Sequence, residues 1–391
     1  MKKPYLLVSG DFVKTGGMDR ANYALADYLS SRGDEVHLVA YRAAPELVDR
    51  SNLTLHRVRK PLNSYTLSRP LLDRLGRSVA ARLMPRGGRV VVNGGNCRWG
   101  DVNWVHHINK LDTPKPGGSP LRRLKTHLDY HAHVRAERSA LAMARTLITT
   151  CEKNRDDLVA EFGLPATRVE VVHYGTDPDV FRPATPAEKS EAKAKLGWAV
   201  DRPVYLFVGA LGDRRKGFDT LYDAWASLCS DPSWVADLVV VGDGAERPIW
   251  EAKASAAGLG ERMRFLGFRR DVPDLFRACD AHVLPSRYEG YSLVTLEALC
   301  CGLPAFVTRT AGIAEQFEGE LAEALLIVNP DDAPSLARML RSWRDREESV
   351  RPALNTFSDK LRRFTWDDMA GQIAAILDDQ SRPTGSKRDR D

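Results

Sequence analysis

The chain has 391 residues, which is long for one hydrophobic core and predicts two or three domains. With 43% hydrophobic and 28% charged residues, it has the composition of an ordinary water-soluble globular protein, which argues against a fibrous or largely disordered chain. No apolar run approaches the roughly 18 residues that a membrane-spanning helix needs. The net charge is +5, and the polar tail, residues 381–391, is expected to be disordered.

The six cysteines form no CxxC pair and no regular framework, which indicates free thiols in a reducing compartment. Residues 1–10 hold only a short apolar run and lack the pattern of a secretion signal. We therefore expect a cytoplasmic protein.

The first half of the chain has an α/β pattern. An apolar run at 5–8 is followed by Gly16-Gly17, by apolar residues at helical spacing over 21–29, and by a second run at 36–39. This strand–turn–helix–strand order predicts a parallel sheet. Further strands are predicted at 89–92, 146–149 and 169–173.

Residues 57–89 are strongly basic, with nine Lys or Arg against one acid, Asp73. Within this segment, 68–83 predicts an amphipathic helix, with arginines 74, 77 and 82 largely on one side. Its predicted apolar side consists of Leu71, Leu72, Leu75, Val79 and Leu83. Such a helix either packs its apolar side on the sheet or docks on an anionic membrane surface.

The second half is also α/β. After a connector at 174–203, short apolar runs alternate with glycine or proline turns and helical stretches, which predicts a doubly wound parallel sheet. The runs lie at 204–209, 238–242, 263–267, 281–285, 304–308 and 324–328. We predict domains at 1–180 and 181–363, facing each other across a cleft, with a helix at 364–380 that crosses back to the first domain.

Three features could bind a nucleotide sugar. Glu289 and Glu297 flank a turn at 290–293 that opens a helix, where free backbone N–H groups favour a phosphate and the carboxylates can accept sugar hydroxyls. Arg215-Lys216 lies in a loop bounded by Gly209 and Gly217, after the first strand of its domain, and suits a diphosphate. Gly16-Gly17 would let the chain approach a ligand closely. Two surface glutamates, a solvated basic pair and a tight turn are the alternative interpretations.

Together these features resemble the retaining glycosyltransferases of group 1, family 4, which have the GT-B fold and are related to glycogen synthase. The resemblance covers nearly the whole chain. It rests on Gly16-Gly17, 174–177, 215–217, 241–244, 265–268 with Asp271, 285–293, Glu297-Ala298 and 301–304. It implies two Rossmann-like domains and transfer of a hexose-type sugar from a nucleotide diphosphate sugar to an acceptor hydroxyl, with retention of configuration.

The resemblance also implies roles for single residues. Arg215 and Lys216 would hold the diphosphate, Glu297 the ribose and Glu289 the transferred sugar. Backbone donors of Gly290, Tyr291, Ser292 and Leu293 would face the phosphate, the loop Phe268-Arg269-Arg270-Asp271 would lie against the base, and Gly17 would hold the sugar phosphate. A histidine after a strand of the first domain would touch the donor sugar; His106 fits best, with His107 as the alternative.

One position departs from the family pattern. Many members carry an arginine directly after the glycine at 209, and here Ala210 stands there. Either Arg214 or Arg215 compensates, or the donor diphosphate is held with less charge.

No metal and no cofactor other than the sugar nucleotide are expected. Asp177-Pro178-Asp179 and Asp389-Arg390-Asp391 have the acidic DxD spacing but lie in a connector and in the tail. His127, His131 and His133 lack a matching acidic or cysteine cluster. Positive side chains and helix-start amides would then stabilise the leaving nucleotide.

The acceptor is expected to be a carbohydrate or a lipid-linked molecule in surface polysaccharide or glycolipid assembly, and no nucleic-acid partner is expected. A nucleotide-sugar epimerase of GT-B architecture or a non-catalytic nucleotide-sugar binding protein are the alternatives. A dinucleotide dehydrogenase is disfavoured because Arg247 stands where a third glycine is needed after Gly242 and Gly244.

Overall fold

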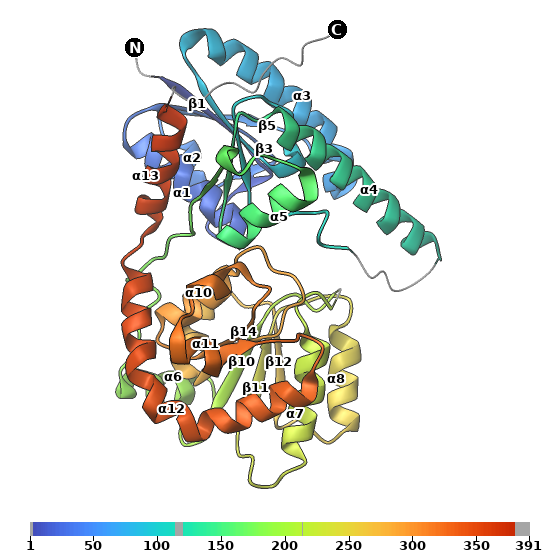
Figure 1. Ribbon diagram of the computed structural model, residues 1–391, viewed down its shortest axis with the longest axis vertical. Coiled ribbons are helices and arrows are strands. Elements are labelled where there is room, and N and C mark those ends of the chain that lie inside the picture. The colour runs from blue at the N-terminus through green and yellow to red at the C-terminus, as the bar shows by residue number, and fades with distance from the viewer. Residues whose placement is uncertain (1–2, 114–119, 213, 380–391) are drawn as a thin grey trace. The chain divides into compact units, whose positions relative to one another are not determined.

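The computed structural model describes residues 3–113, 120–212 and 214–379, and the chain forms two compact units (Figure 1). Unit 1 comprises Met1–Gly175 and Thr365–Asp391, and unit 2 comprises Thr176–Phe364. The first unit thus ends at Gly175 instead of the predicted residue 180, and the chain returns to it at Thr365. The tail 381–391 lies outside the described residues.

Unit 1 contains a parallel sheet of seven strands in the order β5-β3-β1-β6-β7-β8-β9. The strands are β1 (Pro4–Val8), β3 (Glu35–Ala40), β5 (Leu53–Arg57), β6 (Arg89–Asn93), β7 (Val102–Val105), β8 (Thr146–Thr149) and β9 (Val169–Val171). A small parallel pair, β2 (Asp11–Phe12) with β4 (Arg42–Ala43), lies beside it. The strand order reverses between β1 and β6, and ligands of such sheets bind at the carboxyl ends near that point.

Two strand predictions in unit 1 need correction. The apolar runs do not include β5, in which only Leu53 is buried, because the strand lies at the edge of the sheet. The predicted strand at 169–173 is shorter, since β9 ends at Val171.

The helices of unit 1 are α1 (Gly17–Ser31), α2 (Pro45–Val48), α3 (Tyr65–Leu83), α4 (Pro120–Met143), α5 (Glu152–Phe162) and α13 (Trp366–Asp378). The last of these, α13, lies beside α1 although it is far away in sequence (Figure 1). It begins with a capping box between Thr365 and Asp368.

The point where the chain leaves unit 1 lies against the point where it returns. A Cβ atom on Gly175 would lie 2.2 Å from the carbonyl oxygen of Thr365, so that only glycine fits there. The rings of Tyr174 and Trp366, the neighbours of these two residues, are 6.1 Å apart. This close approach ties α13 to the end of the first segment of unit 1.

The observed helix α3 differs from the predicted amphipathic helix in its start and in its buried face. It begins at Tyr65, and its buried face includes Leu72, Val79 and Leu83 together with the small residues Gly76 and Ala80. A Cβ on Gly76 would lie 3.0 Å from Val8, so the helix packs closely on β1. Leu71 is 44% exposed, so it does not share this buried face with Leu72, Val79 and Leu83 as predicted.

Unit 2 contains a parallel sheet of six strands in the order β12-β11-β10-β13-β14-β15, which is the strand order of a Rossmann sheet. The strands are β10 (Val204–Val208), β11 (Asp237–Val241), β12 (Met263–Gly267), β13 (Ala281–Leu284), β14 (Ala305–Thr308) and β15 (Leu326–Ile327). The last strand is shorter than the predicted 324–328, because Ala324 and Leu325 belong to a helix.

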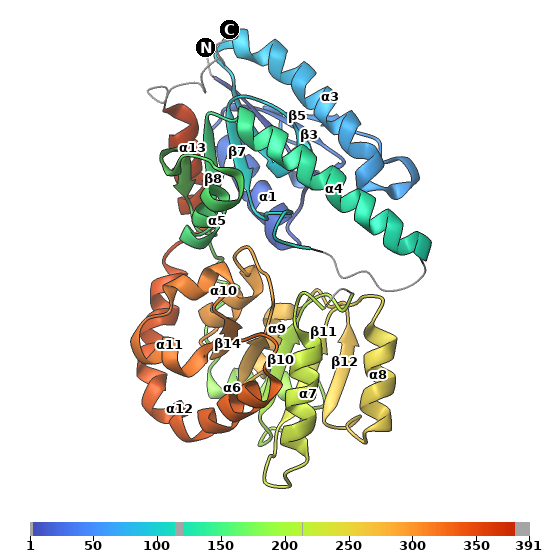
Figure 2. The same cartoon turned by 45° about the vertical axis from the view of Figure 1, so that its right-hand side comes forward.

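Helices surround the sheet of unit 2, and α7 packs against α12 (Figure 2). They are α6 (Pro186–Lys195), α7 (Phe218–Cys229), α8 (Arg247–Ala256), α9 (Val272–Ala278), α10 (Leu293–Cys300), α11 (Gly319–Leu325) and α12 (Ala333–Arg362). Leu206 in β10 and Val239 in β11 pack with Phe276 on α9 and Ala298 on α10, which holds these two helices against the sheet. Among the helices that the structure describes, none has the length and hydropathy needed to cross a bilayer.

Candidate active site

The loops after β10, β11 and β13 contact one another at the carboxyl end of the unit 2 sheet. The backbone N–H of Gly209 donates to the carbonyl of Val241 over 2.9 Å, and a Cβ on Gly242 would lie 1.9 Å from the Gly209 carbonyl oxygen. Gly217 has a φ of +70°, and a Cβ there would lie 1.8 Å from the carbonyl oxygen of Pro285. Glycines therefore allow three loops to meet where the strand order reverses.

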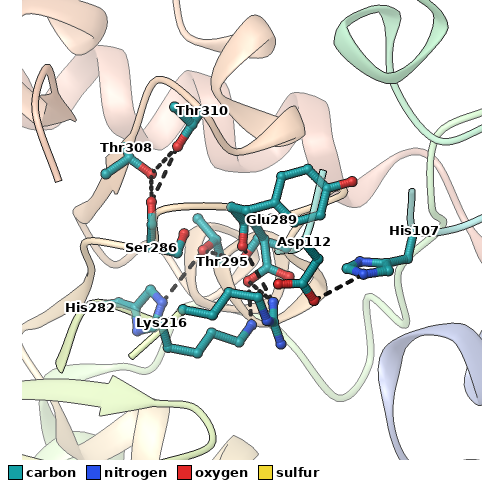
Figure 3. A network of polar contacts seen from close by, with 12 residues as sticks. His107, Asp112, Lys216, His282, Ser286, Glu289, Thr295, Thr308 and Thr310 are labelled. Atoms are coloured by element: carbon teal, nitrogen blue, oxygen red, sulfur yellow. Dashed lines mark hydrogen bonds and ion pairs between the residues drawn. The ribbon is translucent and has the colours of Figure 1, made fainter. Parts of the chain in front are cut away.

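The predicted basic pair and the predicted glutamate meet at this edge. The Lys216 ammonium group forms a salt bridge with the Glu289 carboxylate, and Arg215 Nη1 lies 3.8 Å from the same oxygen (Figure 3). Arg215 also donates to the carbonyl of Tyr288 over 3.3 Å. The side chains of Lys216 and Glu289 are 15% and 14% exposed, so these charges are largely removed from water and compensate each other.

The structure distinguishes the two arginines that could compensate for Ala210. Arg215 lies beside Glu289, whereas Arg214 Nε lies 3.6 Å from a carboxylate oxygen of Glu246. Arg215 is therefore the arginine near the predicted sugar ligand.

Arg287 joins the same two loops, although it was not among the predicted site residues. Its backbone N–H donates to the carbonyl of Arg215 over 2.8 Å, and its guanidinium group donates to the carbonyl of Arg214. The guanidinium group also binds both carboxylate oxygens of Asp219, in the first turn of α7, at 2.8 and 2.9 Å. In the sequence, only the positions of Arg287, two residues before Glu289, and of Asp219, two residues after Gly217, could have suggested this contact.

The segment from Ser286 to Glu289 is also held from β14. The hydroxyl groups of Thr308 and Thr310 donate to the carbonyl of Ser286 over 2.6 and 3.2 Å (Figure 3). On the other side, the ring of buried His282 lies 3.1 Å from the Leu206 carbonyl through Nδ1, and burial lowers the pKa of His282 to about 4. The two threonines thus fix the backbone that leads to Glu289, and neutral His282 links β13 to β10.

The turn at 290–293 opens α10, as the sequence predicted. Ser292 has a φ of +84°, unusual for a residue other than glycine, and its hydroxyl lies 2.8 Å from that of Thr295. Tyr291 is buried, and its hydroxyl accepts a hydrogen bond from Gln316 over 2.5 Å. The side chain of Tyr291 therefore anchors the turn. Glu297 lies about one helical turn after the start of α10.

The loop after β12 lies at the same edge of the sheet. The N–H of Gly242 donates to the carbonyl of Gly267 over 2.8 Å, which joins this loop to that after β11. Phe268 is 67% exposed, and the Arg269 guanidinium group pairs with the Asp271 carboxylate at 2.7 Å. An exposed ring beside a fixed ion pair has the surface that a flat base can contact.

In unit 1 the two candidate histidines have different environments. His106, directly after β7, is buried; its Nδ1 lies 2.7 Å from the Tyr174 hydroxyl, and its Nε2 has no hydrogen-bond partner among the described residues. Burial lowers the pKa of His106 to about 3, so the ring is neutral. His107 is more exposed and lies 3.1 Å from a carboxylate oxygen of Asp112. Gly16, with a φ of +84°, caps α1 after β1.

Two family models match this chain. Glycosyltransferase Family 4 matches residues 15–180, and Glycosyl transferases group 1 matches residues 202–345. The chain belongs to the group 1 glycosyltransferases and has the GT-B fold.

Curated relatives and solved structures agree with this family. A lipopolysaccharide core biosynthesis mannosyltransferase, LpsB, from Rhizobium meliloti is 30% identical over 58% of this chain and 66% of its own length. A D-inositol 3-phosphate glycosyltransferase from Xylanimonas cellulosilytica is 30% identical over 72% of this chain and 66% of its own length. The matches thus span slightly less than two thirds of these relatives.

Two solved structures share the fold of this group 1 glycosyltransferase. Sucrose-phosphate synthase from Thermosynechococcus elongatus has a TM-score of 0.75 at 22% identity, covering 96% of this chain and 98% of its own. Anabaena HepE, solved in complex with UDP and glucose, has a TM-score of 0.70 at 19% identity, covering 96% and 99%.

In the described part of the chain, the other candidate residues do not come together as metal ligands. His127 and His131 lie 3.1 Å apart through their Nε2 atoms, on the exposed part of α4. Residues 3–113, 120–212 and 214–379 contain no cluster of three or more His, Cys, Asp or Glu suited to a metal ion. Asp177 and Asp179 lie in the turn that enters unit 2, and residues 389–391 lie outside the described part.

The buried, neutral His106 predicts a pH dependence of stability. The pKa of His106 in the folded protein, about 3, lies below the value near 6.5 in an unfolded chain. The neutral ring therefore contributes fully to the free energy of unfolding above pH 6.5, and this contribution is lost as the pH falls toward 3. Unfolding in urea at several pH values measures this effect. Below pH 6.5 the free energy of unfolding of the wild type should fall by roughly 1.4 kcal/mol more per pH unit than that of His106→Gln. The exposed-histidine control His127→Gln should keep the wild-type slope, and parallel slopes for wild type and His106→Gln would contradict the prediction.

Proposed function

We propose that this chain transfers a hexose-type sugar from a nucleotide diphosphate sugar to an acceptor hydroxyl, with retention of anomeric configuration. The observation that carries the proposal is the contact of Lys216 and Arg215 with Glu289 where the strand order of unit 2 reverses. Two cations suit a diphosphate, and a carboxylate beside them suits the hydroxyls of the attached sugar. The UDP and UDP-glucose complexes of Anabaena HepE support a nucleotide sugar as the donor.

In the proposed reaction the nucleoside diphosphate leaves with its negative charge increased on the oxygen that was bound to the sugar. Lys216 and Arg215 would stabilise this charge together with the N–H groups at the start of α10, without a metal ion. Glu297 would accept the ribose hydroxyls, Phe268 would contact the base, and Gly16-Gly17 would lie near the sugar phosphate.

His106 would contribute a neutral imidazole to the transferred sugar. Its Nδ1 is engaged by Tyr174, which leaves Nε2 for a sugar hydroxyl. A neutral ring next to a developing positive charge on the sugar avoids the repulsion that an imidazolium ion would cause. His107, which is paired with Asp112, is the weaker candidate.

Release of nucleoside diphosphate from UDP-, GDP- and ADP-sugars, with and without candidate acceptors and in the presence of EDTA, tests this proposal. We expect turnover with one of these donors in EDTA, and at least a hundredfold lower turnover in Lys216→Ala and Glu289→Ala, since the first removes charge stabilisation and the second a sugar ligand. Arg341→Ala, which breaks an exposed ion pair with Asp231, is the matched control and should keep full turnover.

Absence of turnover with nucleotide binding retained would indicate a non-catalytic binding protein. A change of sugar configuration without transfer would indicate an epimerase. Loss of turnover in EDTA alone would remove only the metal-independent part of the proposal.

We also propose that unit 1 docks on an anionic membrane and takes a lipid-linked acceptor of surface polysaccharide or glycolipid assembly. Exposed apolar side chains lie near the start of α3 and along the start of α4, among the basic residues of 57–89 and Arg123 and Lys125. These side chains are Leu62, Tyr65, Leu67, Leu71, Leu121, Leu124 and Leu128, with Leu62 90% exposed. Arg69 on α3 interacts electrostatically with Asp129 on α4, which places the two helices close together. Apolar residues among cations match the interface of an anionic bilayer.

Co-sedimentation with phosphatidylglycerol and phosphatidylcholine vesicles measures this docking. We expect binding to the anionic vesicles that weakens in high salt, and at least tenfold weaker binding for Leu124→Glu/Leu128→Glu, because apolar contact is replaced by repulsion. Ile249→Glu, an exposed apolar position on α8 of unit 2, should bind like wild type. Equal binding of the α4 variant and wild type would contradict membrane docking.

A further inference from the structure

A glutamate on α4, Glu137, has no exposed surface and lies outside every site described so far. Its Oε1 accepts hydrogen bonds from the backbone N–H of Asn109 at 2.9 Å and from the Asn109 side-chain amide at 2.8 Å. Its Oε2 accepts from the backbone N–H of Lys110 at 3.3 Å. Burial raises the pKa of Glu137, and these three donors oppose that shift.

The segment that Glu137 holds is the turn that directly follows β7. His106 and His107 lie at its start, and within it the N–H of Leu111 donates to the carbonyl of Ile108 over 3.1 Å. Asp112, at its end, contacts His107. The carboxylate thus binds the middle of a short turn whose first residues are the two candidate sugar-contacting histidines.

The backbone of α4 at Glu137 is itself fixed relative to the sheet. A Cβ on Gly95, in the loop after β6, would lie 2.9 Å from the Glu137 nitrogen, so loop and helix are in direct contact. The side-chain amide of Asn103, in β7, donates to the carbonyl of Gly94 over 2.9 Å and holds that loop. Glu137 therefore connects the turn after β7 to the contact between α4 and the loop at Gly95.

A carboxylate is suited to this task in a way that an amide is not. All three groups that face it are N–H donors, and both carboxylate oxygens accept. A glutamine could keep the bonds to one oxygen, but its NH2 group would face the N–H of Lys110. That would leave the partly buried N–H of Lys110 without this acceptor and weaken the hold on the turn.

We propose that Glu137 is a positioning residue that sets the place of the His106–Asp112 turn, and thereby of the imidazole that contacts the donor sugar. This inference rests on the proposed function. Tyr174 fixes the His106 ring from one side, and Glu137 fixes the backbone that carries it from the other. Glu137 touches no substrate and acts through the turn.

Hydrogen–deuterium exchange tests the anchoring without any substrate. In full-length Glu137→Gln we expect the amides of Asn109 and Lys110 to exchange at least tenfold faster, while the amides of β1 and α1 keep their wild-type rates. Asn109→Ala, which removes one donor and leaves α4 unchanged, should show a smaller increase at Lys110, and it serves if Glu137→Gln does not fold. Glu161→Gln is the control, because Glu161 binds the same turn only through the Lys110 side chain.

Kinetics test the consequence for the reaction. Glu137→Gln should lower kcat at least tenfold with the KM for the nucleotide sugar unchanged within about twofold, and it should cause little further loss in a His106→Ala background. Wild-type exchange rates at 109 and 110 in Glu137→Gln, or losses that multiply with those of His106→Ala, would overturn the inference. If the wild type turns over no donor, the proposed function fails, and the exchange rates still decide whether Glu137 anchors the turn.

Discussion

The salt bridge between Lys216 and Glu289 joins the loop after β10 to the segment after β13, the two strands between which the order of the unit 2 sheet reverses. Two opposite charges can be largely buried together only when they are paired, so each loop depends on the other for its position. Gly217 allows the backbones to touch, and Arg287 binds carbonyl groups of the first loop from the second. The positions of Arg215, Lys216 and Glu289 relative to one another follow from this contact.

The candidate site residue of unit 1 is a buried neutral side chain, whereas those of unit 2 are paired charges. His106 is neutral because its ring is removed from water, and the turn that carries it is held by Glu137, a carboxylate satisfied by N–H donors. The exposed side of the same unit is basic and partly apolar. The neutral imidazole of His106 would not repel an electron-poor sugar, and the basic, partly apolar surface suits the proposed docking on an anionic membrane.

Much of the fold could be predicted from the sequence, because apolar runs bounded by glycine or proline mark the central strands of a parallel sheet. The edge strand β5 was missed because only one of its residues is buried, so it has no apolar run. The two-residue β15 was overextended because the apolar run that contains it begins in helix α11. The resemblance to the group 1 glycosyltransferases also implied that Lys216 and Glu289 belong to one site. It did not indicate Arg287 or Glu137, whose partners lie far away in sequence, and Leu71 was misplaced because Gly76 and Ala80 form the contact face of α3.

Calorimetric titration of UDP, GDP and ADP into wild type and Lys216→Ala, in EDTA, tests most directly whether the joined loops hold a nucleoside diphosphate. We predict that one diphosphate binds the wild type at least tenfold more tightly than the variant, a difference of about 1.4 kcal/mol or more, while the corresponding nucleoside binds both proteins equally. Equal binding of that diphosphate by wild type and variant would contradict the assignment of this edge of the sheet as the donor site.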